Sequence, residues 1–532
     1  MTERLLERVR ELLLLAGRDI GEPAARAVVG AALRRLDEPL RVAIAGKVKA
    51  GKSTLLNAMV GEELAPTDAG ECTKIVTWYR DGPAYRVVVH LADGPAEQRP
   101  FRRQSGAIRV DLGHPAERVD RLDVELPSRR LREHTLIDTP GLASISAEVS
   151  VRTLAHLGAD DEHRAQADAV VYLLRHMHGT DIRFLEAFRG DDLARGSPIN
   201  AVGVLSRADE IGGCRLDAMA TAGTVAARYQ ADERLRRLCP IVVPVAGLLG
   251  AAGATLREEE FRTLRLIAEA PATDLVAALL TADRFVAARS ALAVPGAARA
   301  RVLERLGLFG VRLGVQLIRD GTVHHADALA RELTVRSGLD RLLEILAAQF
   351  LGRSEVLKAR SALTTLDDVL RTHRYDAGGD LAARAEEIRA GAHEFVEIRL
   401  LHLLSSGRLP GAPDRLAELT RLLGGAGAEP AIRLGLPPDT PPETLLVEAD
   451  AALRRWRRIA GHPMTVHEMR AAARATVRTC EGLLTGLRTS RSGSCSRPTG
   501  SVRRRRAPVS ARTPGSGCST GSACSGSASA CI

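Results

Sequence analysis

The chain is poor in aromatic residues, with 8 phenylalanines, 5 tyrosines and 2 tryptophans among 532 residues. Large strand sandwiches draw on aromatic side chains, whereas helices pack well through leucine and alanine. The composition therefore argues against an all-β protein and favours helices. A chain of this length is expected to form at least two folded units, because a single core rarely grows beyond about 300 residues.

Closely spaced cysteine pairs are also missing. None of the eight cysteines has a paired metal-ligand spacing, and half of them lie in the tail, at Cys495, Cys518, Cys524 and Cys531. This pattern fits a protein of the reducing cytoplasm. The segment Met1 to Ala16 mixes charged residues with leucines and does not match a secretory signal peptide.

A continuous apolar span is lacking too. The segment Leu238 to Leu256 holds 19 residues without a charge, but two prolines and three glycines interrupt it. A membrane-crossing helix needs about 20 continuous apolar residues. We expect a buried strand followed by a loop in this segment, rather than a membrane span.

The formal net charge of +10 is concentrated near the C-terminus. Residues 489–532 contain seven arginines and no acidic residue, which leaves the rest of the chain at +3. The nearly balanced body argues against a protein that binds nucleic acid through a basic surface. Because the tail consists almost wholly of small and polar residues and arginine, we expect it to be disordered. We interpret it as an out-of-frame translation of a GC-rich gene end.

The pattern of apolar residues changes along the chain. Two helices are predicted first, one through Leu5, Val9 and Leu12 and one over 23–36. Short apolar runs separated by Gly, Pro and Asp follow, which is typical of an α/β fold with a mainly parallel sheet and helices on both faces. These runs are Val42–Ala45, Tyr85–Leu91, Arg121–Leu126, Thr135–Ile137, Ala169–Leu174, Ala201–Leu205 and Ile241–Val245.

Beyond about Glu258 only helical patterns remain. Ser337 is expected to cap a helix whose apolar stripe runs from Leu339 to Phe350. Further helices, separated by Gly- and Pro-rich breaks, are predicted over Asp380–Leu404, Pro413–Leu423, Pro442–Arg458 and Val466–Leu487. The second unit is therefore predicted to be an extended all-α bundle.

The clearest motif is the loop at residues 46–53, which follows a predicted strand and precedes a predicted helix, the order of a phosphate loop. Its backbone N–H groups would point at phosphates, Lys52 would reach the β- and γ-phosphates, and the Ser53 hydroxyl would bind Mg²⁺. The residues expected to contact phosphate are Gly46, Lys47, Val48, Lys49, Ala50, Gly51, Lys52, Ser53 and Thr54.

Two further segments would complete a triphosphate site. Asp138 follows a predicted strand and would hold Mg²⁺ through water, and the Gly141 N–H would sense the γ-phosphate. A threonine after the first helix of this unit would complete the metal shell when the γ-phosphate is present. Thr73 is the preferred candidate, and Thr67 and Thr77 are alternatives.

The base is predicted to be guanine. Ser206 to Asp209 follow another strand, and the Asp209 carboxylate can accept both the ring N–H and the exocyclic amino group of guanine, a donor pair that adenine lacks. Arg207 would lie over the base. The backbone at Ala246 would face the guanine oxygen. The sequence thus predicts a site for GTP, as substrate, with Mg²⁺ as cofactor.

Taken together, these motifs resemble the bacterial dynamin-like GTPases, and most of all their isoniazid-inducible actinobacterial branch. The resemblance extends to Leu487. It is strong over Gly46–Leu56, the Thr73 segment with 75–79, Asp138–Gly141 and Leu205–Asp209, and softer over 337–339, 357–363 and 455–457.

The resemblance implies neck helices at 1–37, a GTPase domain at 38–270, a helical neck and trunk at 271–488 and the tail at 489–532. It implies that the N-terminal helices are buried against 442–487. It also implies nucleotide-dependent pairing, as a homodimer or with a dynamin-like paralogue, coupled to remodelling of an anionic membrane. The protein would then act at the inner face of the cell membrane, with no specific nucleic-acid partner.

Two departures limit what the resemblance implies. Val48 and Lys49 stand where eukaryotic dynamins have Gln and Ser, so Val48 cannot orient a water, and the catalytic candidates are Lys52, Thr73 and Lys49. A clear apolar membrane tip is also lacking. Residues 407–410 or 432–436 are candidates for lipid contact, with interhelical loops as the preferred interpretation, and 454–458 fits a solvated neck face better than a headgroup site.

Two other functions remain open from the sequence. One is a GTP-regulated factor that binds ribosomes or RNA, which the near-neutral body disfavours. The other is a nucleotide-binding scaffold with little turnover, paired with an active paralogue, which the Val48 substitution keeps open.

Overall fold

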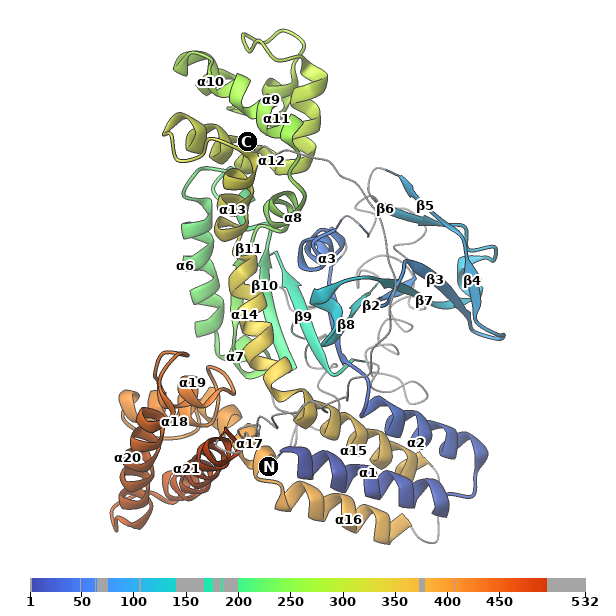
Figure 1. Ribbon diagram of the computed structural model, residues 1–532, viewed down its shortest axis with the longest axis vertical. Coiled ribbons are helices and arrows are strands. Elements are labelled where there is room, and N and C mark those ends of the chain that lie inside the picture. Colours follow the sequence, from blue (N-terminus) through green and yellow to red (C-terminus); the bar gives the residue numbers. More distant parts are fainter. Residues whose placement is uncertain are drawn as a thin grey trace, which may run out of the picture.

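The computed structural model describes residues 2–47, 49–62, 64, 75–104, 107–139, 167–175, 182, 185, 200–372, 378–405 and 407–494. A strand-rich region forms the middle of the molecule (Figure 1). A helical bundle lies at one end of its strands, and a second layer of helices lies at the other end.

Nine of the described strands form one sheet. The strands are β1 (Leu40–Gly46), β2 (Val76–Asp81), β3 (Arg86–Leu91), β4 (Glu97–Arg99), β7 (Val119–Leu126), β8 (His134–Asp138), β9 (Ala169–Leu174), β10 (Ala201–Ser206) and β11 (Val242–Val245), with a separate hairpin of β5 (Phe101–Gln104) and β6 (Ala107–Val110). The order is β11-β10-β9-β1-β8-β2-β7-β3-β4, and β1 runs parallel to both β8 and β9. Since β2 is antiparallel to β8, the sheet is mixed but mainly parallel, as predicted.

Helices cover both faces of the sheet. Because side chains alternate along a strand, neighbouring residues of β1 enter two different cores. One core includes α3 (Lys52–Val60) and α14 (Leu339–Gln349). The other includes α6 (Ala218–Ala231) and α7 (Glu233–Leu238). The predicted α/β architecture with two covered faces is therefore confirmed.

The uncharged segment Leu238 to Leu256 was expected to end in a loop, but it ends in helix α8 (Gly247–Thr255). Its glycines serve close packing against α13 (Ala326–Arg336). A Cβ atom placed on Gly253 would lie 2.4 Å from the Thr334 hydroxyl oxygen, and one on Gly250 would lie 3.3 Å from the Ser337 Oγ. The loop prediction was wrong because it took contact-forming glycines for turn formers. No helix among the described residues is both long and apolar enough to cross a bilayer.

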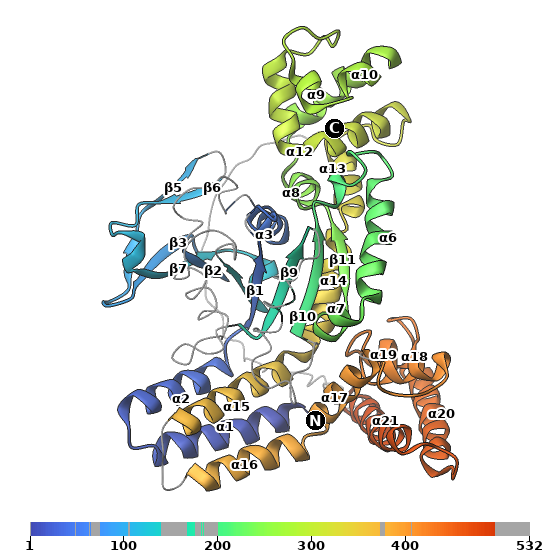
Figure 2. The ribbon, with the colours of Figure 1, turned by 180° about the vertical axis from the view of Figure 1, so that it is seen from behind.

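The N-terminal helices form where predicted, as α1 (Thr2–Asp19) and α2 (Pro23–Arg35), but their partners differ. They pack against α15 (Ser354–Thr372), and α1 also packs against α16 (Gly378–Gly391). The four helices lie side by side in both views (Figures 1 and 2). The expectation that they bury their stripe mainly against 442–487 was therefore wrong.

The C-terminal helices pair among themselves, which explains that correction. Trp456 is fully buried, and the helix that carries it packs along the next one in the chain. The pattern predicted as one helix over 380–404 is broken at Ala392, and the last helix continues to Ser494, into the segment assigned to the tail. These helices are α17 (His393–Ser405), α18 (Pro413–Leu422), α19 (Pro430–Leu434), α20 (Pro442–Gly461) and α21 (His467–Ser494).

A helical layer covers the carboxyl ends of β10 and β11 (Figure 1). It contains α9 (Glu258–Ala268), α10 (Ala272–Ala278), α11 (Ala282–Val286) and α12 (Gly296–Arg319). Helix α12 is interrupted at Gly307, whose φ of 67° and ψ of 171° are not helical. The N-cap of α14 is Gly338, and not Ser337 as the sequence had predicted. The Ser337 Oγ, one residue earlier, accepts the Leu339 N–H at 3.1 Å.

Candidate nucleotide site

The phosphate loop turns the chain from β1 directly into α3. Gly46 has a φ of 149°, and a Cβ atom at this position would lie 2.9 Å from the carbonyl oxygen of Leu173. Gly51 and Lys49 are left-handed, with φ of 92° and 60°. This tight turn brings the amino end of α3 to the carboxyl edge of the sheet, where its free N–H groups favour an anion. Val48 lies outside the described residues.

The Lys52 side chain folds back over this loop. Its Nζ donates to the carbonyl oxygens of Gly46 and Lys47, each at 3.3 Å. Burial lowers the pKa of the ammonium, and the nearby Asp138 opposes that change. Both hydrogen bonds are long, so phosphate oxygens entering the loop can replace these carbonyls as acceptors at little cost.

Asp138 and Ser53 approach one another beside Lys52. The parallel pairing of β1 and β8 places Asp138 opposite Ile44, and its Oδ2 lies 3.5 Å from the Ser53 Oγ. The Asp138 Oδ1 is buried without a hydrogen-bond partner among the described residues. Burial raises the pKa of this carboxyl to about 6, although Lys52 and Ser53 both act to lower it. A hydroxyl and an unfilled carboxylate oxygen are the donor types that Mg²⁺ takes, so these residues fit the predicted ion.

Several residues predicted for this site lie outside the described residues, namely Thr67, Thr73, Pro140, Gly141 and Val48. The alternative Thr77 is a buried strand residue opposite Asp138, and its hydroxyl donates to the carbonyl oxygen of Ile75 at 3.3 Å. Thr139 was not given a role by the sequence, but its hydroxyl donates to the Ile44 carbonyl at 2.9 Å. Thr139 thereby fixes the start of the Asp138 loop to β1.

The base-reading segment follows β10. Asp209 lies in a short 3-10 helix, Ala208–Glu210, and only 7% of the residue is exposed. Burial raises the pKa of its carboxyl to about 6. Arg207 is left-handed, with a φ of 52°, and its Nη1 donates to Glu210 at 2.8 Å. The Ser206 Oγ donates to the carbonyl oxygen of Leu174 at 3.3 Å. Ser206 therefore fastens the segment to β9, and Arg207 lies partly exposed beside Asp209.

The role predicted for Ala246 is not supported by its geometry. The Ala246 N–H donates to the carbonyl oxygen of Ser337 at 2.8 Å. This amide is used in joining the end of β11 to the start of α14, so it does not face a base. The sequence could not reveal this, because the acceptor lies in a distant helix.

Helix α12 supplies neighbours of Asp209 that the sequence analysis missed. A Cβ atom placed on Gly307 would lie 3.8 Å from the Asp209 Oδ2 and 3.3 Å from the Leu248 Cδ2. A glycine inside a helical pattern was the available signal, since it often marks a kink or a close contact.

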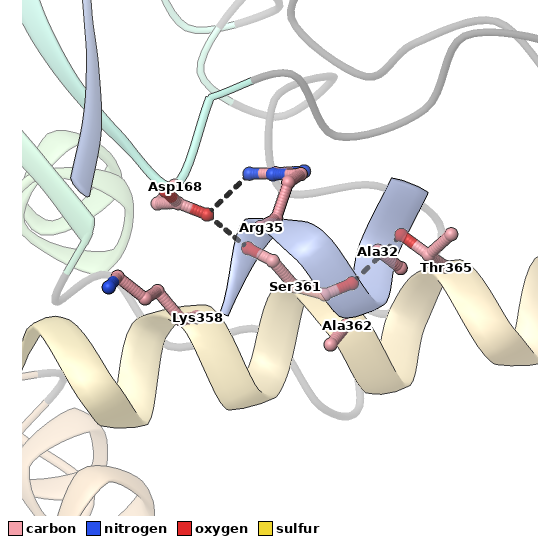
Figure 3. A pocket seen from close by; sticks show the side chains of 7 residues that line it. All are labelled: Ala32, Arg35, Asp168, Lys358, Ser361, Ala362 and Thr365. Atoms are coloured by element: carbon pink, nitrogen blue, oxygen red, sulfur yellow. Dashed lines mark hydrogen bonds and ion pairs between the residues drawn. The ribbon is translucent and has the colours of Figure 1, made fainter. Parts of the chain in front are cut away.

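A second polar cluster lies at the opposite, amino end of the strands. Figure 3 shows Asp168 between α2 and α15. Its Oδ1 accepts from the Arg35 Nη2 at 2.7 Å and the Ser361 Oγ at 2.8 Å, and its Oδ2 accepts the Arg41 N–H at 2.9 Å. Lys358 lines the same small pocket and donates to the Leu36 carbonyl at 3.1 Å. This cluster joins the helical bundle to the sheet and is separate from the phosphate loop.

The family model described as the Dynamin family matches residues 42–180. The chain is 43% identical over 455 residues to the isoniazid-induced protein IniC of Mycobacterium tuberculosis, covering 85% of this chain and 91% of that protein. It is 34% identical over 122 residues to a bacterial dynamin-like protein of Nostoc punctiforme, covering 20% and 17% of the two chains.

Among solved structures, the chain is similar to a member of an oligomerised bacterial dynamin pair described as sensing and tethering membranes at long range. The identity is 12%, the coverage is 92% of this chain and 79% of that one, and the TM-score is 0.33. A likeness this weak adds nothing to the sequence relationship.

Proposed function

The chain belongs to the dynamin family of GTPases, in the bacterial branch that contains the isoniazid-induced proteins. On this premise we propose that it hydrolyses GTP with Mg²⁺ at the site around Lys52. We propose further that it couples nucleotide-dependent self-association to membrane binding or remodelling. The self-association would be a homodimer or an assembly with a dynamin-like paralogue. The place of action would be the inner face of the cell membrane.

The residues divide the work of binding. The phosphate loop, Gly46 to Thr54, surrounds the phosphates, and Lys52 exchanges its two carbonyl acceptors for β- and γ-phosphate oxygens. Ser53, Asp138 through a water, and Thr73 would hold Mg²⁺, which would withdraw charge from the phosphates. Asp209 accepts the two guanine donors, with Arg207 over the base and Ser206 supporting the segment, while the Gly141 N–H senses the γ-phosphate.

The observation that carries this proposal is the Asp138 oxygen that no described residue fills. It lies beside a hydroxyl and an ammonium at the end of a glycine-rich turn. A buried acceptor without a donor is unusual in a folded protein, and a hydrated Mg²⁺ ion satisfies it. The matching experiment is phosphate release from GTP by the full chain and by Lys52→Ala, with and without Mg²⁺. We expect release that needs both Mg²⁺ and Lys52, and Mg²⁺-independent release would refute the assignment.

Lys49 is proposed to support hydrolysis in place of the missing Gln and Ser. Its left-handed backbone holds it at the bend of the loop, where its charge can act on the leaving phosphates. Hydrolysis is then slow in a single chain, or it depends on a second copy. Single-turnover rates measured over a range of protein concentrations test this, and a rate independent of concentration would remove the dimer from the proposal.

The proposed domains are 1–37, 38–270 and 271–488, followed by the tail at 489–532. The packing of α1 and α2 against α15 and α16 supports a neck made from both ends of the GTPase domain. The carboxyl part, α17 to α21, would then be the trunk.

We place the membrane contact at the turn between α20 and α21. In the two segments considered from the sequence the central leucines are buried, since Leu409 and Leu434 are only 3% and 6% exposed. Met464 in the turn is 84% exposed and Val466 is 51% exposed, and arginines of both helices flank them. Apolar tips within a basic surface fit an anionic lipid interface.

Sedimentation with vesicles that contain anionic lipid tests this placement. The double substitution of Met464 and Val466 by serine is expected to weaken binding several-fold. Serine at Val335, which is 67% exposed on α13, is the matched control, and equal losses in the two variants would reject the turn. The tail is removed from all variants, because its arginines would bind vesicles by charge alone.

A further inference from the structure

The segment that follows Asp209 has an unusual backbone. Gly212, Gly213 and Cys214 are all left-handed, with φ of 65°, 74° and 59°. Cys214 carries a side chain, so this conformation is unfavourable for it and persists only where the surroundings hold it. Arg207, two residues before Asp209, is left-handed as well, with a φ of 52°. The short helix that carries the base-reading carboxylate is thus followed directly by a loop that needs outside support.

Arg312 of α12 supplies that support. Its Nη1 donates to the carbonyl oxygens of Gly213 at 2.8 Å and Cys214 at 2.6 Å. The Nε and Nη2 donate to the carbonyl of Leu279 at 3.1 and 2.7 Å, and the Nη2 also reaches Leu280 at 3.2 Å. One planar guanidinium therefore joins the base-reading loop, the end of α10 and α12, which a single ammonium cannot do.

The same helix also approaches Asp209 itself. The interruption at Gly307 brings the backbone of α12 to a point where an added Cβ atom would lie 3.8 Å from the Asp209 Oδ2. Helix α12 thus bounds the carboxylate with its kink and ties the following loop with Arg312. These contacts come from a region, 296–319, that no nucleotide-binding motif includes.

We propose that α12 sets the guanine selectivity of the site, with Arg312 as a positioning residue that keeps Asp209 oriented toward both guanine donors. The inference rests on the proposed function, because it assumes that Asp209 reads guanine. Loss of Arg312 releases the carbonyls of Gly213 and Cys214, the loop leaves its left-handed conformation, and the carboxylate no longer aligns with two donors at once. Affinity for a base with one donor then suffers less than affinity for guanine.

The test compares GDP with inosine diphosphate, which lacks the exocyclic amino group. Affinities are measured by calorimetry for the full chain, for Arg312→Ala and for Arg319→Ala. Arg319 is a matched control, because it lies on the same helix and also binds backbone carbonyls, those of Ala268 at 3.2 Å and Ala270 at 2.9 Å, away from the loop. We expect Arg312→Ala to lose about tenfold in GDP affinity, less in inosine diphosphate affinity, and Arg319→Ala to stay within about twofold in both.

An unchanged ratio of the two affinities in Arg312→Ala would overturn the inference, because a merely structural role weakens both nucleotides equally. If circular dichroism shows that Arg312→Ala is unfolded, the same ratio of GDP affinity to inosine diphosphate affinity is measured for Arg312→Lys. For the inference to hold, this ratio must lie between the wild-type value and one, the value without discrimination. A wild-type chain that binds neither nucleotide would instead refute the proposed function. The two failures are therefore distinguishable.

Discussion

Two aspartates at opposite ends of the same strands show how differently a fold can treat a carboxylate. Asp168, at the amino end, accepts hydrogen bonds from Arg35, Ser361 and the Arg41 amide. Asp138, at the carboxyl end, has among the described residues only the Ser53 hydroxyl at 3.5 Å, and within this part of the chain one of its buried oxygens stays unfilled. A carboxylate whose acceptors are all used holds elements together, whereas one left short of donors is arranged for a ligand.

The two aspartates also join the sheet to different parts of the molecule. Asp168 links the sheet to α2 and α15, so it is placed to keep the helical bundle in register with β1 and β9 (Figure 3). Asp138 links the sheet to the phosphate loop. Substitutions at the two positions should therefore affect different quantities.

The largest effect is expected from Asp168→Ala. Its side chain is 3% exposed and its partner Arg35 14% exposed, and removing one member of a buried pair costs about 3 kcal/mol of unfolding free energy. Urea unfolding measures that loss. The Kd for GDP should remain within about threefold of wild type, because distant sites are usually independent. A stable Asp168→Ala protein would break the comparison.

Asp138→Asn should give the opposite result. Phosphate release in the presence of Mg²⁺ is expected to fall about 10- to 100-fold, the usual cost of losing a group that holds a metal through water. Stability should be kept or raised at neutral pH, because the ionised carboxyl is the form that burial disfavours. Activity assays and unfolding curves on the same preparation check both halves, and a large loss of stability would contradict the assignment.

The third effect concerns pH and the guanine reader. Burial raises the pKa of Asp209 to about 6, and only the ionised carboxylate accepts both guanine donors. The affinity for GDP is therefore highest above pH 6, where Asp209 is ionised. Below pH 6 it falls by up to about tenfold per pH unit, because Asp209 must release a proton before GDP can bind.

This pH dependence is measured without Mg²⁺, so that metal binding by Asp138 does not enter the profile. The terminal phosphate of GDP also titrates near pH 6, so Asp209→Asn serves as the control. Its pH profile should show the phosphate and Asp138, whose pKa is also raised to about 6, without Asp209. Identical profiles for the two proteins would exclude Asp209 as a titrating group.

The smallest effect is expected from Gly307→Ala. A φ of 67° is unfavourable for alanine, at a cost of about 1 kcal/mol of stability, and the added methyl group would press on Leu248 at 3.3 Å. Gly223→Ala in α6 is the control, because a Cβ atom there meets nothing within 4 Å and alanine favours a helix by up to about 1 kcal/mol. Thermal unfolding should shift in opposite directions.

The sequence predicted the elements whose signal is local. The boundaries of β9 match the prediction, and those of β1 and β10 lie within two residues of it, because buried parallel strands give continuous apolar runs. The phosphate loop was found because its glycines, lysine and serine are contiguous. Asp138 and Asp209 were likewise identified because each belongs to a short contiguous motif that directly follows a predicted strand.

Features that depend on distant contacts were missed. Strand β2 was missed because its sequence, Val76–Asp81, mixes apolar and polar residues and is not a continuous apolar run. Its Trp78 is buried beneath the guanidinium groups of Arg41, Arg80 and Arg121, each within 4.7 Å of the ring centre. The glycines of α8 were taken for loop residues, because their close packing against α13 cannot be deduced from the local sequence. The partners of α1 in α15 and α16, and the acceptor of the Ala246 amide, lie more than 80 residues away in sequence.

The most direct test of the central claim is a calorimetric titration of the nucleotide-free full chain with GTP and with ATP, in the presence of Mg²⁺. The account predicts saturable heat with GTP, lost in Lys52→Ala, and no displacement of bound GTP by a large excess of ATP. Equal binding of ATP, or no heat with GTP, would contradict a site in which the phosphate loop holds the triphosphate and Asp209 selects the base.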